Sequence, residues 1–143
     1  MLRRSLALAP LLALAVALGA CSSGDDASSS TTAKPAAGPD LTTKDFVDST
    51  GQADVTVQVK DNTFNAPYVK VDAGTTITFT NKGHNTHDVY PVVDGDFTPI
   101  EVADLEPGES VTLTLDHAGD IAYYCTLHGT TTKGMVGGFR VAG

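Results

Sequence analysis

The residues with the most distinctive chemistry in this chain lie close together near its C-terminal end. Cys125, His128 and Met135 place a thiol, an imidazole and a thioether on one segment that leaves a predicted strand. Cysteine thiolate and methionine thioether are soft metal ligands, and imidazole suits several transition metals. The spacing therefore indicates a candidate transition-metal site.

A second imidazole would complete a site suited to copper. Cu(I) favours thiolate and thioether and Cu(II) favours imidazole, so two histidines, one thiolate and a weak axial methionine serve both oxidation states. Residues 81–89, which follow another predicted strand, contain His84 and His87. His84 could reach a metal from the same loop. We expect His87 to be the ligand, because it directly precedes Asp88 and Val89, where the next strand should hold it rigidly.

The cysteine count supports a special role for Cys125. The chain has two cysteines, Cys21 and Cys125, and exported domains normally pair their cysteines. If Cys21 carries a lipid, Cys125 is a buried inert thiol, a reactive nucleophile or a metal thiolate. A buried thiol is the default by composition, but the neighbouring His128 and Met135 favour a metal thiolate.

The elements that must position these residues are predicted to be β-strands. Short runs rich in Val, Ile, Thr, Tyr and Phe recur between clusters of Gly, Pro, Asn and Asp, and no long stretch repeats apolar residues at helical spacing. The pattern predicts an all-β Greek-key β-sandwich of about 7–8 strands, whose ends gather the loops. The expected strands are residues 54–60, 67–71, 75–81, 87–91, 110–115, 121–125 and 137–141. Residues 97–105 are compatible with a short helix or a loop.

The first 40 residues are predicted to serve export and tethering. Arg3 and Arg4 precede a short apolar run, residues 6–18, and the sequence Leu18-Gly19-Ala20-Cys21 resembles the lipobox of bacterial lipoproteins. We expect residues 1–20 to be a lipoprotein signal peptide and Cys21 to be lipidated. An ordinary secretory signal with an incidental cysteine is the alternative. Residues 21–40 are rich in Ser, Thr, Ala and Pro, which predicts a flexible linker. Residues 41–143 have the size of one domain.

The charge of the chain argues against nucleic acid as a partner. It has 9 Lys and Arg against 17 Asp and Glu, a net charge of −8. Removal of residues 1–20 takes away two arginines and leaves a net charge of −10, from 7 basic and 17 acidic side chains. An acidic surface keeps a domain soluble and can steer it toward basic partners at low ionic strength.

The order of these motifs resembles the cupredoxins, the type 1 blue-copper proteins, of the plastocyanin and pseudoazurin type. The resemblance runs from about residue 55 to residue 141. It is carried by Asn81 after a strand, His87-Asp88-Val89, Pro107-Gly108, Tyr123-x-Cys125-x-x-His128 and Gly134-Met135-Val136-Gly137. It implies one type 1 copper ion, with His87, Cys125 and His128 as the trigonal ligands and Met135 as a long axial contact. His128 would be the ligand nearest to solvent.

Two positions depart from the pattern of that family. Six residues separate His128 from Met135, where plastocyanin-type loops usually have four. Met135 can still return to the metal if the extra Thr-rich residues bulge outward, and Gly129 and Gly134 would permit the backbone angles. Asp88 stands where asparagine is frequent. An ionised Asp88 would favour oxidised copper and lower the reduction potential.

The resulting hypothesis is a one-electron carrier and not an enzyme, since four protein ligands leave no open position for a substrate. It would be lipid-anchored to the extracytoplasmic face of a bacterial membrane, in the periplasm or at the cell surface. Its expected partners are redox proteins, such as a cytochrome or a copper or haem oxidoreductase, and no small-molecule substrate. We expect a monomer. The alternatives are a copper-trafficking or storage module, a metal-free β-sandwich interaction module, or a thiol enzyme, for which no third group orients His128.

The remaining histidine and the aromatic residues have simpler interpretations. His117 lies in a predicted turn and is expected to have no special role. Tyr123, Tyr124, Phe79 and Phe139 are expected to be core or sheet residues, because aromatic side chains are enriched in strands and bury large areas.

Overall fold

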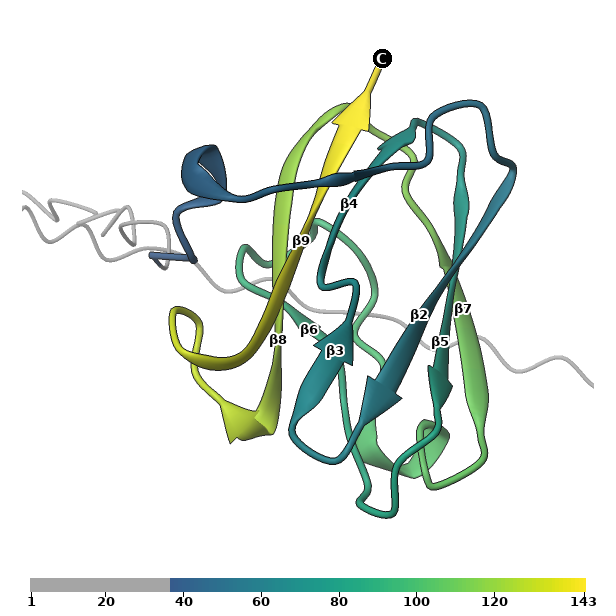
Figure 1. Cartoon of the computed structure of the whole chain (residues 1–143), viewed down its shortest axis with the longest axis vertical. Coiled ribbons are helices and arrows are strands. Elements are labelled where there is room, and N and C mark those ends of the chain that lie inside the picture. Colours follow the sequence, from purple (N-terminus) through teal and green to yellow (C-terminus); the bar gives the residue numbers. More distant parts are fainter. Residues whose placement is uncertain (1–36) are drawn as a thin grey trace, which may run out of the picture. The chain divides into compact units, whose positions relative to one another are not determined.

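A computed structural model of the chain describes residues 37–143 (Figure 1). The predicted signal peptide, Cys21 and most of the predicted linker lie outside the described residues. No helix within residues 37–143 combines the length and the hydrophobicity that crossing a membrane requires. The two helical segments of this part are single 3-10 turns, η1 (Leu41–Thr43) and η2 (Val102–Asp104).

The described chain forms a two-sheet β-sandwich, which confirms the expected all-β fold class. One sheet has the order β1 (Val47–Asp48), β4 (Tyr68–Asp72), β9 (Gly134–Ala142), β8 (Gly119–Gly129) and β6 (Tyr90–Pro91). The other has the order β3 (Thr63–Asn65), β2 (Asp54–Lys60), β5 (Thr76–Asn81) and β7 (Ser110–Thr114). The pairs β1–β4, β4–β9 and β2–β5 are parallel, and the remaining pairs are antiparallel.

The core between the sheets follows from strict alternation along the strands. In β2, Val55, Val57 and Val59 are buried and the residues between them are exposed. The middle of the core is aromatic: Tyr123 stacks on Phe139 with ring centroids 4.8 Å apart, and Phe79 meets the Tyr123 ring edge-on at 5.4 Å. Tyr123, Phe139 and Phe79 are therefore core residues, and Tyr124 is a half-buried sheet residue on the opposite face of β8, as expected.

Several strands differ in extent from those expected. The described residues form nine strands, two more than the seven expected ranges. The two additional strands, β1 and β3, are too short to show alternation in the sequence. The expected strand at 87–91 is reduced to Tyr90–Pro91, preceded by a single bridge between Val89 and Ile100. Conversely, β8 and β9 reach well beyond residues 121–125 and 137–141 and pair as a long hairpin. Residues 97–105 contain η2 and the loop leading to it.

The connections near the candidate ligands gather at one end of the sandwich. β5 and β2 run in parallel and end together, with Val59 opposite Asn81, and the backbone N–H of Lys82 donates to the Val59 carbonyl at 2.8 Å. The far end of β8 lies at the same end of the molecule (Figure 1). The loop that follows β5 and the C-terminal end of β8 therefore lie side by side.

Candidate metal centre

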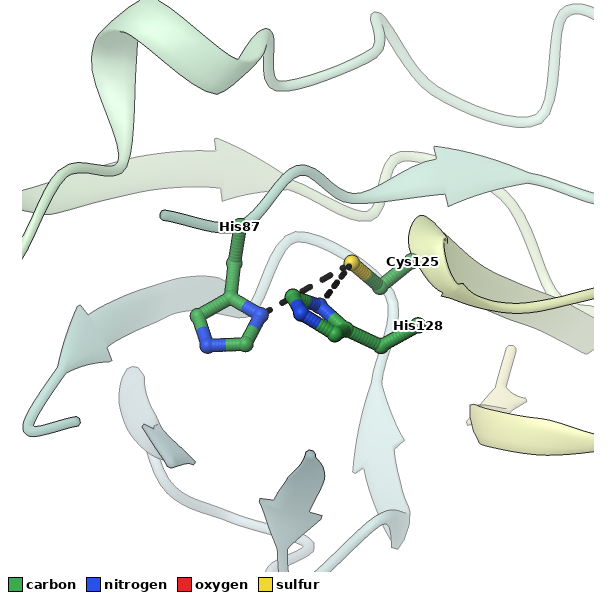
Figure 2. A group of neighbouring side chains, drawn as sticks. All are labelled: His87, Cys125 and His128. Atoms are coloured by element: carbon green, nitrogen blue, oxygen red, sulfur yellow. Dashed lines mark hydrogen bonds between the residues drawn. The ribbon is translucent and has the colours of Figure 1, made fainter. Parts of the chain in front are cut away.

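The structure brings three of the four predicted ligand side chains together. The ligating atoms of His87, Cys125 and His128 all lie within 4.8 Å of one another. The Nδ1 atom of His87 is 3.7 Å from the Cys125 Sγ, and the Nδ1 atom of His128 is 3.5 Å from it. Figure 2 shows both rings turned with these nitrogens toward the sulfur.

Cys125 and His128 can face the same point because β8 is irregular between them. In a regular strand, side chains three positions apart lie on opposite faces. The pairing of β8 with β9 shifts register between Tyr124 and Gly129, as at a β-bulge, and a bulge redirects the side chains of the bulged strand. This irregularity turns a C-x-x-H sequence into two convergent donors. His87 comes from the segment that crosses between the two sheets, after β5 and before β6.

The burial of the three residues differs. His87 and Cys125 are fully buried, whereas His128 is half-buried, so His128 is the one nearest to solvent, as the resemblance implies. Burial raises the pKa of the Cys125 thiol. Burial, and secondarily the proximity of His128, lowers the pKa of His87 and favours its neutral imidazole. A neutral imidazole is the form that binds metals, and a coordinated thiol loses its proton outright.

Met135 returns to the core after an outward turn. Gly129 pairs with Gly134, and the backbone N–H of Thr130 donates to the Lys133 carbonyl at 2.8 Å, so residues 130–133 form the tip of the β8–β9 hairpin. Gly134 has a φ of 80°, and a Cβ there would lie 2.7 Å from the His128 carbonyl oxygen. Met135 then joins the buried cluster that contains Cys125. The six-residue spacing is therefore accommodated in the manner expected, and the axial contact of Met135 stays a prediction.

The other two histidines lie apart from this group. The His84 side chain is 93% exposed, and its Nδ1 faces the Asp61 carboxylate at 3.2 Å. His117 is 3.9 Å from Asp96, near the turn between β7 and β8. The choice of His87 over His84 agrees with this arrangement.

Asp88 and Asn81 connect the two segments to the scaffold, a role that sequence reasoning missed. The buried Asp88 carboxylate accepts the backbone N–H of Thr126 at 2.7 Å and also the Thr126 hydroxyl. It thus ties the residue after His87 to the residue after Cys125. The buried Asn81 side chain donates to the carbonyls of Asn85 and Leu105. The positions of Asn81 after a strand and of Asp88 beside the first histidine were the available signals.

The donor set fits copper. Two imidazole nitrogens and one sulfur converge, no carboxylate belongs to the group, and Cys125 is a buried free cysteine. Sulfur with imidazole suits copper, whereas magnesium and calcium prefer oxygen ligands. The His87 Nε2 atom is buried without a hydrogen-bond partner among the described residues, so the ring is held by packing and by its Nδ1 side.

Comparisons with known proteins agree with this chemistry. A family model for copper-binding proteins of the plastocyanin/azurin family matches residues 51–142. Among solved structures, a reduced amicyanin variant aligns with a TM-score of 0.54 and 23% identity, covering 63% of this chain and 83% of amicyanin. An oxidised amicyanin variant aligns with a TM-score of 0.53 and 23% identity over 62% of this chain and 81% of that one.

A copper-containing nitrite reductase from Thermus scotoductus also aligns, with a TM-score of 0.51 and 27% identity. The alignment covers 62% of this chain but only 22% of the reductase. No curated protein matches the chain. The amicyanin likenesses show the fold, and the family model adds the copper-binding assignment over most of the described residues.

Proposed function

Because this chain belongs to the plastocyanin/azurin family of copper-binding proteins, we propose that it is a one-electron carrier, exported and tethered to a membrane. Its cofactor is one copper ion, which His87, Cys125 and His128 would hold, with Met135 as the proposed fourth ligand. The copper supplies the redox chemistry by cycling between Cu(I) and Cu(II). The observation that carries the proposal is the convergence of two Nδ1 atoms on the Cys125 sulfur.

The residues around the metal would keep the same arrangement in both oxidation states. His87 and Cys125 are fully buried. The Asp88 carboxylate, next to His87, accepts the backbone N–H of Thr126, next to Cys125, and so links the two ligand segments. Donors locked by packing and hydrogen bonds move little when the charge of the site changes. Little movement means little reorganisation energy, which is what fast electron transfer requires. Met135, approaching from β9, would be the weak axial ligand.

His128 marks the route by which electrons would enter and leave. It is the half-buried member of the group, and the adjacent Leu127 is an exposed large apolar side chain, with 51% of its surface accessible. An exposed apolar residue beside a half-buried ligand suits brief contact with another redox protein, such as a cytochrome or a copper or haem oxidoreductase. The partners we propose are therefore proteins.

An enzymatic role has less support from the site. The Cys125 thiol is fully buried and its pKa is raised, whereas a reactive nucleophilic cysteine is accessible and has a lowered pKa. Four protein donors also leave no position for a substrate. The aligned nitrite reductase is a far longer chain, of which this protein spans about a fifth, so its reaction is not transferred here.

The tether is proposed from the sequence of residues 1–40. Cys21 after Leu18-Gly19-Ala20 would be lipidated, and residues 22–40 would link the anchor to the copper domain. Lipid chains contribute about 0.8 kcal/mol per buried methylene, so two or more chains hold a domain at a membrane. The Cys21→Ser variant should be found in the soluble fraction of cells that express it and not in the membrane fraction. Retention of that variant in membranes would contradict lipid anchoring.

The first experiment is an optical titration of the polypeptide from Cys21 to Gly143. Cu(II) is added, and the visible spectrum is followed during reduction with ascorbate and reoxidation with ferricyanide. We expect an intense blue band at about 600 nm, typical of copper bound to thiolate, which bleaches and returns. The Cys125→Ser variant is the matched control and should stay folded by circular dichroism but show no band. A folded, copper-exposed protein without the band would favour a trafficking or metal-free module.

A further inference from the structure

The loop that delivers His87 has no regular structure to hold it. Residues 82–86 connect β5 to His87 and form neither helix nor strand. The backbone N–H of Lys82 donates to the Val59 carbonyl at 2.8 Å, which fixes only the start of the loop. A ligand at the end of such a segment needs other contacts to keep its position, because an unpaired loop is mobile.

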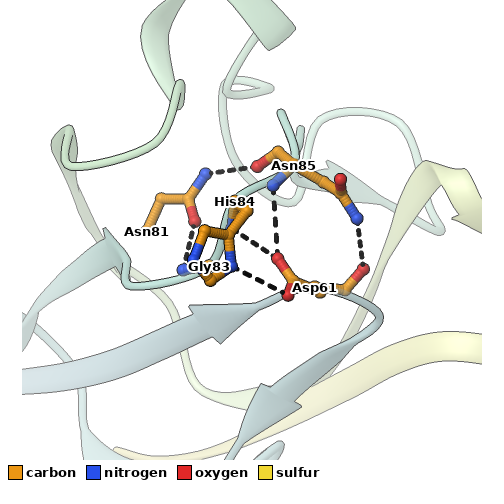
Figure 3. A network of polar contacts seen from close by, with 5 residues as sticks. All are labelled: Asp61, Asn81, Gly83, His84 and Asn85. Carbon is orange, nitrogen blue, oxygen red and sulfur yellow. Dashed lines mark hydrogen bonds and ion pairs between the residues drawn. The ribbon is translucent and has the colours of Figure 1, made fainter.

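One side of the loop is held by Asn81 (Figure 3). Its Oδ1 accepts the backbone N–H of Gly83 at 2.9 Å, and its Nδ2 donates to the Asn85 carbonyl at 2.8 Å. The same Nδ2 donates to the Leu105 carbonyl at 2.9 Å. The buried amide therefore closes the loop upon itself and ties it to the segment after η2.

The other side is held by Asp61, in the turn between β2 and β3. Its Oδ1 accepts the backbone N–H groups of His84 and of Asn85, the latter at 3.2 Å. Its Oδ2 faces the His84 Nδ1 at 3.2 Å, and its backbone carbonyl accepts from the Asn85 side chain at 3.2 Å. Hydrogen bonds to a carboxylate are about twice as strong as neutral ones. One carboxylate thus holds two successive residues just before the ligand.

Gly83 shows how closely the turn and the loop approach. A Cβ on Gly83 would lie 2.5 Å from the Asp61 Oδ1 and 2.8 Å from the Asp61 backbone nitrogen. Real Cβ contacts of this length do not occur, so the approach requires glycine at this position. The close approach of the two backbones places the Asp61 carboxylate within hydrogen-bonding distance of the His84 and Asn85 N–H groups.

The charge of Asp61 also reaches the ligand. The Asp61 carboxylate accepts hydrogen bonds from the backbone of His84 and Asn85, three and two residues before His87. A nearby negative charge favours the more positive, oxidised state of a metal site. The Asp61 side chain is nearly half exposed, so salt should weaken this effect.

We propose that Asp61 is a positioning residue for the copper site. It holds residues 82–86 so that the His87 Nδ1 faces the Cys125 sulfur, and its negative charge favours the oxidised metal. The inference rests on the proposed copper function for its second half only. The first half, the fixing of the loop, is a property of the metal-free protein and can be tested there.

The loop is tested in the copper-free protein by amide hydrogen exchange. In the Asp61→Ala variant, the amides of His84 and Asn85 should exchange at least about tenfold faster, because each loses a hydrogen bond to a charged acceptor. The amide of Phe79 in β5 should be unchanged, which shows that the core is intact. Asp94→Asn is the matched control, because it removes one negative charge from an exposed turn. Unchanged exchange at His84 and Asn85 in Asp61→Ala would overturn the proposal.

The effect on the site is tested with copper bound. Asp61→Asn keeps the size of the side chain and one acceptor oxygen, and it should raise the reduction potential relative to wild type and to Asp94→Asn. The difference should shrink at high salt. Asp61→Ala should in addition broaden or shift the blue band and release copper to a chelator several-fold faster. Faster exchange of the loop amides with an unchanged potential, spectrum and release rate would mean that Asp61 only stabilises a surface loop, which contradicts a positioning role.

These two arms separate failure of the inference from failure of the proposed function. If the wild-type protein binds copper without a blue band, the electron-carrier proposal fails whatever the Asp61 variants do. If the wild-type protein is blue and the Asp61 variants match it in both arms, only the inference fails.

Discussion

At the scale of single residues, the site depends on side chains whose chemistry and packing can be changed separately. Met135 is the clearest example, because it is both a member of the buried cluster with Cys125 and the proposed axial ligand. A thioether donates weakly to copper and tunes its potential, whereas a leucine of similar volume only fills space. The two roles therefore predict different results for the same substitution.

The Met135→Leu variant should stay blue but have a higher reduction potential, because loss of the thioether donor destabilises Cu(II) more than Cu(I). The free energy of unfolding in urea should change by less than about 1.5 kcal/mol, since the substitution conserves side-chain volume. Cyclic voltammetry and urea titration measure the two quantities. A wild-type potential and spectrum in this variant would make Met135 a core residue without a ligand role.

Asp88 offers a second test at this scale. The Asp88→Asn variant keeps an acceptor for the Thr126 N–H, which now meets Asp88 at 2.7 Å, but it removes a buried negative charge beside His87. The reduction potential should rise, because a nearby negative charge favours the more positive oxidised site. Redox titration of the variant against wild type measures this. An unchanged or lower potential would refute the electrostatic role of Asp88.

The ligand residues could be predicted from the sequence because thiol, imidazole and thioether are rare types at a characteristic spacing. His87, Cys125 and His128 do meet, and His84 lies outside the group. The supporting residues could not be predicted. Asp61 acts on a loop more than 20 residues later in the chain, and only the parallel pairing of β2 with β5 brings the two together. No local pattern indicates such a contact.

At the scale of elements, strands with one buried face were predictable and irregular ones were not. The alternation of β2, β5 and β7 predicted their extents to within a residue. The ends of β8 and β9 were missed, because a register shift and glycines interrupt the alternation that marks a strand. The same irregularity is what lets Cys125 and His128 face one point, so the pattern failed where the site is built.

The β8–β9 hairpin gives a prediction about its glycines. Gly134 and Gly51 have almost the same φ, 80° and 81°, but a Cβ at Gly51 meets nothing within 4 Å whereas at Gly134 it meets the His128 carbonyl oxygen. Both alanine variants should lose about 1–2 kcal/mol from backbone strain. Gly134→Ala should lose at least about 1 kcal/mol more from the clash. Urea unfolding of the copper-free proteins measures both losses.

The spectrum of the two glycine variants provides a further check on the hairpin. Gly134 lies between His128 and Met135, so its alanine variant should alter the blue band, and Gly51→Ala should not. Equal destabilisation of the two variants, with identical spectra, would mean that the hairpin tip adjusts without moving the ligands.

At the scale of the whole molecule, acidic residues determine how stability depends on pH. Hydrogen bonds lower the pKa of four carboxyl groups among the described residues. The pairs are Asp40 with Thr42, Asp48 with Thr50, Asp61 with His84, and Asp120 with Arg140. Among the carboxyl groups of residues 37–143, only Asp96 has a raised pKa, because burial disfavours its charged form. A lowered pKa means that the unfolded chain takes up protons first, so the stabilisation is present above about pH 4, the unfolded value, and is lost as the pH falls through the folded value.

Urea unfolding midpoints of the copper-free protein should therefore fall steeply below about pH 4. A smaller decline should begin near pH 6.5, because the pKa of His87 is lowered in the folded protein and the unfolded chain takes up that proton first. The Asp120→Asn variant should show a weaker fall, because its ion pair with Arg140, at 2.9 Å, no longer titrates. Asp94→Asn, which removes an exposed carboxylate, should follow wild type. A steeper fall in Asp120→Asn than in wild type would reverse the assigned sign.

The position of the ligands along the chain affects how the protein matures. His87 lies on the segment that crosses from one sheet to the other, and Cys125 lies 38 positions later, in β8. His87 and Cys125 therefore meet only after β6, which follows His87, has paired with β8, so metal capture follows folding. Until then Cys125 is an ordinary exposed thiol, and in the oxidising compartment proposed for this protein it can cross-link to other chains. The speed with which β6 pairs with β8 thus decides whether this sulfur becomes a ligand or half of an unwanted disulfide.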